Sequence, residues 1–556
     1  MISPTHTNVL RPKARNSKVL ATLIGTALLI SSCSAVPEER LEGSSPVPTP
    51  QTPLSQIGVA AGHPDAAEIG VDVLEAGGNS VDAAVATAFA VSVLEPHASG
   101  IGGGGVSLVA VPGAKPAAFD YREVVAENGK IPASGTGTPG FVDGMWTLHQ
   151  KYGELPWETL LTPAADIARQ GFKIPKFLSE RMNDGVGSQV VSQYPQFRNS
   201  KGTRVLKEGE LLVQDDLADT IETLAASGRD AFYTGSISKK LTQVEGLDSK
   251  TLSKYRTEEF TPVQGQVGQY TVVSAPPALP GAGLIQMLQQ AEGAGIAEDA
   301  PTSGAYAEKL MRAWSNANET VTTQFGDQRF TTVDTEEILD RQANLDIGKN
   351  FEESANTKTP SGPIDPGNTT HLTVVDAQGM MVSMTNTITS FWGGTKSEVV
   401  GGFFLNNQLS RFKTVDSPAN QPEPGRKSVT WSNPTMVLDQ QGRPVLGLGS
   451  PGGQQIPNIL SAVLIPALLH ETPLQEAIDG PRYHLQGGAL AVEGSASADI
   501  LKAAKKQDWK IRETKRVDGI FGSVQALRIN YEDRSLTGAT DSRRDGGHVV
   551  RDAPTP

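Results

Sequence analysis

The chain has 556 residues, of which 38% are hydrophobic and 20% are charged, with one cysteine and a net charge of −13. This is the composition of an ordinary globular protein, and it excludes a disordered chain, a collagen and a protein with many membrane spans. A single cysteine excludes an intramolecular disulfide framework and any cysteine-rich metal or iron–sulfur site. The acidic balance argues against a nucleic-acid-binding protein, because neutralising phosphates requires a basic surface.

The N-terminal residues have the pattern of a secretory signal. Basic residues without any acid precede an apolar run from Val19 to Ile30, which is too short to span a bilayer stably. Ile30-Ser31-Ser32-Cys33 then resembles a bacterial lipobox, in which residues 1–32 are removed and the cysteine thiol is lipidated. We therefore expect an extracytoplasmic lipoprotein, anchored to the cell membrane through Cys33. The alternative is a free thiol beside an ordinary signal peptide.

Residues 33–56 are rich in Pro, Ser and Thr and predict an extended tether that holds the folded part off the membrane. Beyond residue 57, strand and helix patterns follow one another. In chain order we expect helices over 65–76 and 81–94, a strand over 106–111, a mainly helical stretch over 140–350 with a break at 274–283, strands over 371–375, 380–385, 435–438 and 445–448, and a helix over 458–470. Strand-rich blocks flanked by helices predict a layered α/β architecture with the sheets inside.

Common motifs of metal and nucleotide sites are missing from the sequence. It has no His-x-x-x-His pair, no Walker A loop and no Gly-x-Ser-x-Gly elbow. Two stretches match Gly-x-Gly-x-x-Gly, but the one at 100–105 precedes its strand and the one at 447–452 contains Pro451. The second stretch stays open as a weak nucleotide-site candidate. Its other possible use is to offer backbone N–H groups to an oxyanion.

Residues 369–387 predict a β-hairpin whose two strands flank a turn centred on Gln378. In such a hairpin Asp376 faces Met380, and Thr369 faces Thr387 at the open end. Cross-strand neighbours lie close enough for their hydroxyls to form a hydrogen bond. This pairing fits two interpretations, a polar threonine ladder of the kind common in sheets or a pair of threonines with a chemical role.

Nine segments in order along the chain carry a family resemblance: residues 77–84, 99–105, 119–123, 139–140, 369–371, 405–408, 434–435, 449–453 and 481–484. Together they resemble the γ-glutamyltranspeptidase family, also called glutathione hydrolases, which belongs to the N-terminal-nucleophile hydrolases. The resemblance implies a four-layer αββα sandwich of the α/β class, built from two chains after self-cleavage. The large subunit would be 57–368 and the small subunit 369–556, sharing one core.

The same resemblance implies that the precursor cuts itself between Asn368 and Thr369. Thr369 then becomes the nucleophile and its freed α-amino group the base, since an unassisted hydroxyl is a poor nucleophile. Thr387 would orient the nucleophile. Gly452 and Gly453 would offer backbone N–H donors to the tetrahedral intermediate.

Further positions correspond to the family's substrate-binding residues. Arg122 would hold the α-carboxylate of the glutamyl group, a contact that arginine makes well, and Asn407 and Gln408 would line the glutamyl pocket. The implied reaction cleaves γ-glutamyl amides such as glutathione and passes the γ-glutamyl group to water or to an acceptor amino acid or peptide. No metal, organic cofactor or nucleic-acid partner is implied.

Three positions depart from the family pattern and concern the substrate. Ser410 and Arg411 stand where the family has an acidic pair whose second member binds the substrate α-ammonium, and Arg411 would repel that group. Thr430 and Trp431 stand where two adjacent serines are usual, and Thr389 stands where an asparagine is usual.

Two alternatives to a γ-glutamyl enzyme stay open, the first suggested by these departures and the second by the tether and the acidic charge. An acylase of the same family, acting on glutaryl-type or other acidic acyl amides, would suit a substrate without an α-ammonium. A non-catalytic substrate-binding lipoprotein would keep the fold and the tether without turnover. For Arg411 itself, the alternative to a place in the pocket is a solvated surface position.

Overall fold

The computed structural model describes residues 52–351, 359–362, 367–515 and 519–554. The chain divides into two units, Met1–Thr49 and Pro50–Pro556, and the described residues all belong to the second. The predicted signal peptide, Cys33 and the predicted tether up to residue 51 lie outside the described residues. Strand β1 (Gln56–Ala61) begins close to the predicted end of the tether.

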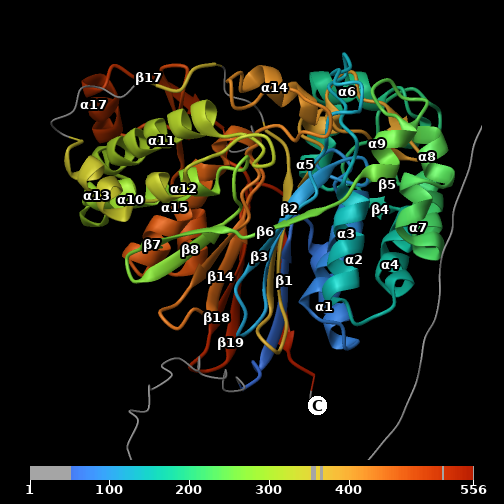
Figure 1. Cartoon of the computed structure of the whole chain (residues 1–556), viewed down its shortest axis with the longest axis horizontal. Coiled ribbons are helices and arrows are strands. Elements are labelled where there is room, and N and C mark those ends of the chain that lie inside the picture. The colour runs from blue at the N-terminus through green and yellow to red at the C-terminus, as the bar shows by residue number, and fades with distance from the viewer. Residues whose placement is uncertain (1–51, 352–358, 363–366, 516–518, 555–556) are drawn as a thin grey trace, which may run out of the picture. The chain divides into compact units, whose positions relative to one another are not determined.

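Two antiparallel sheets form the centre of the second unit (Figure 1). The first has seven strands in the order β20 (Gly547–Asp552), β1, β9 (Thr370–Val375), β10 (Met381–Thr387), β2 (Gly104–Ala110), β3 (Ala117–Asp120) and β6 (Glu258–Phe260). The second has six strands in the order β19 (Ser535–Thr540), β18 (Gln525–Asn530), β14 (Pro444–Gly449), β13 (Thr435–Leu438), β8 (Tyr270–Ser274) and β7 (Val263–Val267). Strands β9 and β10 contact β14, so the sheets are stacked face to face.

Helices cover the outer faces of both sheets (Figure 1). The side of the seven-stranded sheet carries α1 (Pro64–Glu75), α2 (Ser80–Leu94), α3 (Phe141–Tyr152), α4 (Trp157–Gln170), α5 (Lys176–Asn183), α6 (Gly185–Val191), α7 (Asp215–Tyr233), α8 (Ser236–Leu241) and α9 (Ser249–Lys254). The side of the six-stranded sheet carries α10 (Gly281–Gly293), α11 (Gly304–Gln324), α12 (Thr335–Ile338), α13 (Arg341–Lys349), α15 (Ile456–Leu469), α16 (Leu474–Asp479) and α17 (Ala498–Lys506). The four-layer αββα sandwich implied by the resemblance is therefore confirmed.

Short elements complete the unit. Two pairs of short strands are β4 (Phe172–Lys173) with β5 (Leu211–Leu212) and β11 (Val399–Val400) with β12 (Phe403–Phe404). A small sheet contains β15 (Tyr483–Gln486), β16 (Ala489–Glu493) and β17 (Lys510–Thr514). The remaining elements are helix α14 (Arg411–Thr414) and the 3₁₀ turns η1 (Pro195–Phe197), η2 (Ile296–Glu298), η3 (Phe391–Gly393), η4 (Gln408–Ser410) and η5 (Gly453–Gln455).

Apolar side chains fill the three interfaces between the layers. The two sheets enclose one cluster that includes Leu108, Met381 and Met436. A second lies between the seven-stranded sheet and its helices, and a third between the six-stranded sheet and its helices. Each of these clusters contains residues from both sides of the predicted cut.

Helix α2 is buried along its whole length, as expected of a helix that is apolar on every side. The Asn79 side chain accepts the backbone N–H groups of Val81 and Asp82, and the Asp82 carboxylate accepts the N–H of Asn79, which forms a capping box. The helix packs on β9 and β10 and ends at the cap residue Glu95. Its C-terminal end therefore lies beside the start of β9.

The central hairpin has the predicted register. Val375 pairs with Met381, and Thr370 pairs with Asn386. The same register sets Thr369 opposite Thr387 at the open end. The strand boundaries differ from the predicted ones by one or two residues only.

The stretch 140–350 is mainly helical, as predicted, but it also contains five strands that were not predicted from the sequence, the short pair β4 and β5 and the strands β6, β7 and β8. Strands β7 and β8 form a hairpin around Gly268, whose φ of 56° suits a tight turn. The last predicted helix begins at Ile456 rather than at residue 458, because Pro457 fits the first turn of a helix.

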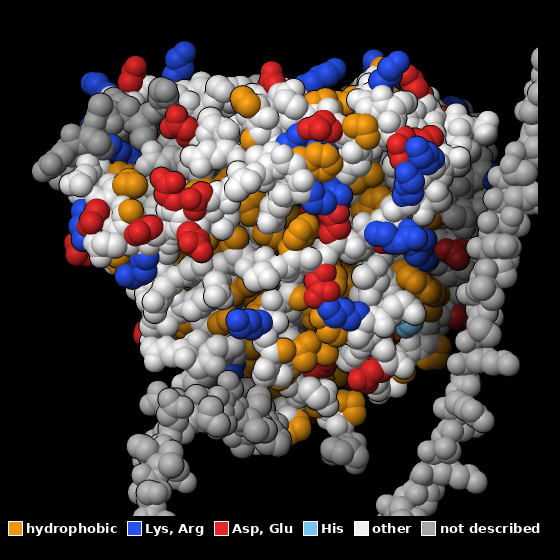
Figure 2. All heavy atoms as spheres, in the orientation of Figure 1, with side chains coloured by type: hydrophobic (Ala, Val, Ile, Leu, Met, Phe, Trp, Pro, Cys, Tyr) orange, Lys and Arg blue, Asp and Glu red, His pale blue; other side chains and the backbone are white. Residues whose placement is uncertain are grey.

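Acidic and basic side chains are mixed over the face shown in Figure 2, with apolar side chains between them. Among the described residues, none of the helices combines the length and the apolar character needed to cross a membrane.

Candidate active site

The predicted threonine pair lies at the open end of the central hairpin. Thr369 immediately precedes β9, Thr387 is the last residue of β10, and Thr369 Oγ1 donates to Thr387 Oγ1 at 3.3 Å. Thr387 Oγ1 also accepts the backbone N–H of Thr389 at 2.8 Å. Both threonines are buried. The hydroxyl of Thr369 is thus fixed in position, as a nucleophile requires.

The same face of the hairpin carries a ladder of polar side chains. His371 Nδ1 lies 2.9 Å from Thr385 Oγ1, and its Nε2 lies 3.1 Å from Thr373 Oγ1. Ser383 Oγ donates to backbone carbonyls of β13 and β14 in the other sheet. Burial lowers the pKa of His371 to about 3, so its neutral imidazole links side chains and is a poor base. The threonine pair is therefore the outermost rung of a polar ladder, and its chemical role stays a prediction.

The residue before the predicted cut is anchored by its side chain. Asn368 Nδ2 donates to the carbonyl oxygens of His97, Ala98 and Ser390 at 2.5, 3.0 and 3.3 Å. The next residue, Thr369, has a φ of 148°, which is strongly disfavoured for a β-branched side chain. The backbone at the Asn368–Thr369 bond is therefore strained.

The glycine loop after β14 lies against this strained segment. Gly452 and Gly453 have φ values of 142° and 56°, which favour glycine. A Cβ built on Gly367 would collide with the backbone nitrogen of Gly453. The loop leads through η5 into α15, so it also forms the N-terminal approach to a helix, where backbone N–H groups are free of helical partners. It thus brings backbone nitrogen close to the chain just before the cut.

A small cavity of about 10 Å³ lies beside Thr369. It is lined by residues from both sides of the predicted cut, namely Asn368, Thr369, Thr387, Thr389, Arg411, Thr430, Trp431, Ser432, Gly453 and Ile456. Arg411 is 8% exposed, so the alternative of a solvated surface position is wrong for this residue. Ligand pockets usually measure about 300–1,000 Å³. The uncut chain leaves less room than that, and we expect cleavage to enlarge the cavity.

A chain of hydrogen bonds leads from this cavity to Arg122. Thr389 Oγ1 donates to Gln408 Oε1 at 2.6 Å, and Gln408 Nε2 donates to Ser428 Oγ at 2.9 Å. Arg122 Nη1 donates to the Ser428 carbonyl at 2.5 Å, and the same guanidinium is paired with Asp120 at 2.6 Å. Burial opposes the ionisation of Asp120, but the adjacent Arg122 charge holds the pKa of that carboxyl well below its usual range.

Asn407 binds the residue that follows Thr389. Its Oδ1 accepts the backbone N–H of Ser390 at 3.0 Å, and its Nδ2 donates to Ser390 Oγ at 3.1 Å. Arg122, Asn407 and Gln408 are not among the residues that line the cavity. Their predicted contacts with substrate stay predictions.

Glu123, next to Arg122, is a buried acid whose two carboxylate oxygens have no hydrogen-bond partner among the described residues. Burial raises its pKa from 4.5 to about 8. The pKa of this acid is higher in the folded chain than in the unfolded chain. Its contribution to the free energy of unfolding is therefore most favourable at a pH below the pKa of the unfolded chain, and it is lost as the pH rises towards 8. Each unit of difference in pKa between the folded and unfolded states changes the free energy of unfolding by about 1.4 kcal/mol.

We therefore expect Glu123→Gln to flatten the decline in the free energy of unfolding between about pH 5 and pH 8. Chemical unfolding at several pH values measures this slope. The exposed Glu245 provides a control, since Glu245→Gln should keep the wild-type slope. If the free energy of unfolding fell with pH equally steeply in Glu123→Gln and in wild type, a raised pKa of Glu123 would be contradicted.

The sequence analysis missed three residues near the cut. Ser432 lines the cavity and could have been found only as the neighbour of Trp431. Glu95 Oε2 accepts the hydroxyl of Thr370 at 2.6 Å, and Arg544 Nη2 donates to the carbonyl of Gly367 at 3.3 Å. In the sequence, Glu95 only marks the end of a helix, and Arg544 lies in a polar run without periodicity.

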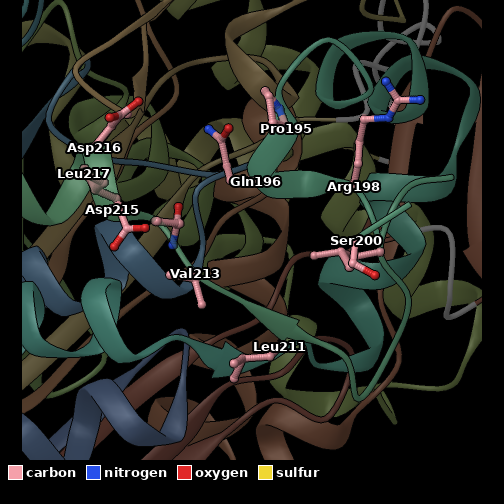
Figure 3. A pocket seen from close by; sticks show the side chains of 12 residues that line it. Pro195, Gln196, Arg198, Ser200, Leu211, Val213, Asp215, Asp216 and Leu217 are labelled. Atoms are coloured by element: carbon pink, nitrogen blue, oxygen red, sulfur yellow. The ribbon is translucent and has the colours of Figure 1, made fainter. Parts of the chain in front are cut away.

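A larger cavity of about 580 Å³ lies elsewhere (Figure 3). It is formed by the segment around η1 and the start of α7, with Arg198 and Ser200 at exposed positions and Asp215 and Asp216 on the opposite side. None of its lining residues belongs to the threonine pair, the glycine loop or the hydrogen-bond chain to Arg122. The chemistry of the chain therefore points to the smaller cavity at Thr369.

Comparisons with known proteins identify the family of the chain. The model of the family described as gamma-glutamyltranspeptidase matches residues 66–550. The capsule biosynthesis protein CapD proenzyme of Bacillus anthracis is 33% identical over 490 residues, which cover 88% of this chain and 90% of that protein. The glutathione hydrolase proenzyme of Bacillus subtilis is 32% identical, and the match covers 88% of this chain and 91% of that protein. An acylase ACY 1 proenzyme of a Pseudomonas strain is 31% identical, with 88% and 93% covered.

Among solved structures, the cephalosporin acylase from Bacillus halodurans has the same fold. It superposes with a TM-score of 0.79 and covers 92% of this chain and 99% of that one, at 23% identity. No comparison supports the alternative of a non-catalytic binding lipoprotein, because the named relatives are proenzymes and acylases. The chain is an enzyme, and it belongs to the γ-glutamyltranspeptidase family of N-terminal-nucleophile hydrolases.

Proposed function

We propose that the chain is a self-cleaving threonine hydrolase and acyltransferase that acts on γ-glutamyl amides such as glutathione. The observation that carries the proposal is the hydrogen bond of 3.3 Å between Thr369 Oγ1 and Thr387 Oγ1, at the strained predicted cut and beside the glycine loop. A glutathione hydrolase proenzyme that is 32% identical over most of the chain supports this class of substrate.

Maturation begins with the Thr369 hydroxyl. Its Oγ attacks the carbonyl carbon of Asn368, and the hydroxyl proton passes to the amide nitrogen of Thr369. The C–N bond breaks and leaves an ester between Asn368 and Thr369 Oγ, together with a free α-amine on Thr369. Water then hydrolyses this ester, which gives a carboxylate on Asn368 and restores the hydroxyl of Thr369.

Turnover uses the groups that maturation creates. The α-amine of Thr369 takes the proton of its own hydroxyl, and Oγ attacks the γ-amide carbon of the substrate. Backbone N–H groups of Gly452 and Gly453 stabilise the tetrahedral oxyanion. The leaving amine receives the proton and departs, and a γ-glutamyl ester remains. Water, or the amine of an acceptor amino acid or peptide, then resolves the ester.

A second candidate is an acylase for glutaryl-type or other acidic acyl amides. The observation that favours it is the position of Arg411, which lines the cavity together with Thr369. A guanidinium there would attract a carboxylate and repel the α-ammonium of a γ-glutamyl donor. An acylase that is 31% identical over 88% of the chain supports this candidate too.

Release of aniline from γ-glutamyl-anilide and glutaryl-anilide distinguishes the two candidates. We expect a higher kcat/KM for the γ-glutamyl compound, measured on the fully cut protein. A preference for glutaryl-anilide would replace the first candidate by the second. Absence of turnover with either compound, in a protein that has been cut, would contradict both.

We also propose that the mature protein is tethered to the membrane by a lipid on Cys33. The support is the position of the sole cysteine of the chain, directly after a basic segment and a short apolar run. Cys33→Ala should move the protein from the membrane fraction to the soluble fraction after cell lysis. Retention of that variant in the membrane fraction would contradict the tether.

A further inference from the structure

The peptide bond predicted to break lies between two buried ionisable residues, Arg544 and Glu95. On the upstream side, Arg544 Nη2 donates to the carbonyl oxygens of Gly367 at 3.3 Å and Gly519 at 3.1 Å. On the downstream side, Glu95 Oε2 accepts the hydroxyl of Thr370 at 2.6 Å. Both residues are 6% exposed. Neither has a role in the chemical steps described above.

Arg544 packs against two neighbouring aromatic rings at this position. Its guanidinium carbon lies 4.8 Å from the ring centre of Phe177 and 5.6 Å from that of Phe391. Its Nε and Nη1 have no hydrogen-bond partner within the described part of the chain. Burial lowers its pKa to about 10, against the opposing charge of Glu95, so the group stays positively charged near neutral pH. A buried cation with unsatisfied donors destabilises a fold, so a local purpose is the natural explanation.

The contact between Glu95 and Thr370 depends on a glycine. A Cβ built on Gly62, which directly follows β1, would collide with both Glu95 Oε2 and Thr370 Oγ1. Glu95 is the cap residue at the end of α2, and Thr370 is the first residue of β9. The hydrogen bond therefore joins a fully buried helix to Thr370, the second residue after the predicted cut.

These contacts fix the chain on both sides of one strained residue. Gly367 is held by Arg544, Asn368 by three backbone carbonyls, and Thr370 by Glu95. Thr369 lies between them with a φ of 148°. Such a conformation persists only where the surroundings hold the chain firmly, since otherwise the backbone relaxes.

We propose that Glu95 and Arg544 are positioning residues for self-cleavage, which keep the Asn368–Thr369 bond in its strained geometry by holding Thr370 and Gly367. This inference rests on the proposed self-cleavage at that bond. Relaxation of either anchor lets Thr369 leave its high-energy conformation, and the attack on the Asn368 carbonyl slows. The two residues touch none of the reacting atoms, so their effect is on the geometry of the precursor.

The test follows the conversion of the full chain into two fragments over time, by denaturing electrophoresis and intact mass. Thr370→Val removes the hydroxyl at nearly constant shape, whereas Thr370→Ser keeps it. Arg544→Met removes the donors and the charge, whereas Arg544→Lys keeps a charge and a donor. Arg551→Met is the control, because Arg551 lies on β20 and pairs with the surface acids Glu68, Asp72 and Glu75.

We expect cleavage to be about tenfold slower or worse in Thr370→Val and Arg544→Met, and to be largely restored in Thr370→Ser and Arg544→Lys. The control should cleave at the wild-type rate. If the role were purely structural, the conservative variant of each pair would also have a lowered melting temperature, and it would not restore the rate of cleavage. Should Arg544→Met fail to fold, the two Thr370 variants decide the question alone.

The outcomes separate this inference from the proposal on which it rests. If wild type is cut while Thr370→Val and Arg544→Met are folded and cut at the wild-type rate, the positioning role is overturned and the proposed self-cleavage stands. If wild type itself is never cut, the proposed function is overturned, and the positioning role with it.

Discussion

Thr369→Ala should leave the precursor in one piece and without turnover. The variant lacks both the nucleophile of the self-cleavage and the nucleophile of the acyl transfer, so no step of either reaction can begin. We expect a loss of at least about 10³-fold in the rate of aniline release, as is usual when a covalent nucleophile is removed. Denaturing electrophoresis reports the cut, and aniline release from γ-glutamyl-anilide reports turnover.

Two further variants sharpen this result. Thr369→Ser keeps a hydroxyl and should still be cut. Thr387→Val removes the hydroxyl that accepts from Thr369 Oγ1 and from the N–H of Thr389, and it leaves the nucleophile in place. The rate of aniline release should therefore fall by an intermediate amount in this variant, about 10- to 100-fold. Cleavage of Thr369→Ala between residues 368 and 369 would show that another group attacks the bond.

Arg411→Asp should shift the preference of the mature enzyme towards γ-glutamyl donors and away from glutaryl compounds. Arg411 is 8% exposed and shares the cavity of Thr369, so the reversed charge acts on the substrate through a partly desolvated space. Two unit charges 4 Å apart interact with an energy of up to about 4 kcal/mol at an effective dielectric constant of about 20. Solvent in the opened cavity reduces this energy. We expect the ratio of the two kcat/KM values to change by about 10- to 100-fold.

The matched control for this change lies two residues further on. Lys413 belongs to the same short helix, α14, but is exposed. Lys413→Asp makes the same change of charge outside the cavity and should leave the ratio almost unaltered, since exposed charges are screened. An equal shift in both variants would mean that the net charge, and not the position of Arg411, sets the preference.

The strand pairing could be predicted from the sequence, because it depends on local periodicity and on one turn. The alternation on both sides of Gln378 fixes the register, and the structure pairs Thr370 with Asn386 as that register requires. Strands β7 and β8 were missed because they are short and lie within a long helical region. The stacking of the two sheets followed from the family resemblance and not from periodicity.

Parts of the site could not be predicted in the same way. Glu95 and Thr370 are 275 residues apart in the chain, and Arg544 and Gly367 are 177 apart, so only tertiary packing brings them together. The strained φ of Thr369 leaves no pattern in the sequence. The departure at Arg411 was visible, but its place in the cavity depends on how the turn η4 and helix α14 fold beside β10.

The N-terminus of the small fragment identifies the cleaved bond and the nucleophile together. We expect the purified protein to separate into two fragments, and the sequence of the smaller one to begin Thr-Thr-His, at Thr369. Its intact mass should correspond to residues 369–556. A chain that stays uncut, or a small fragment that begins at any other residue, would contradict the account.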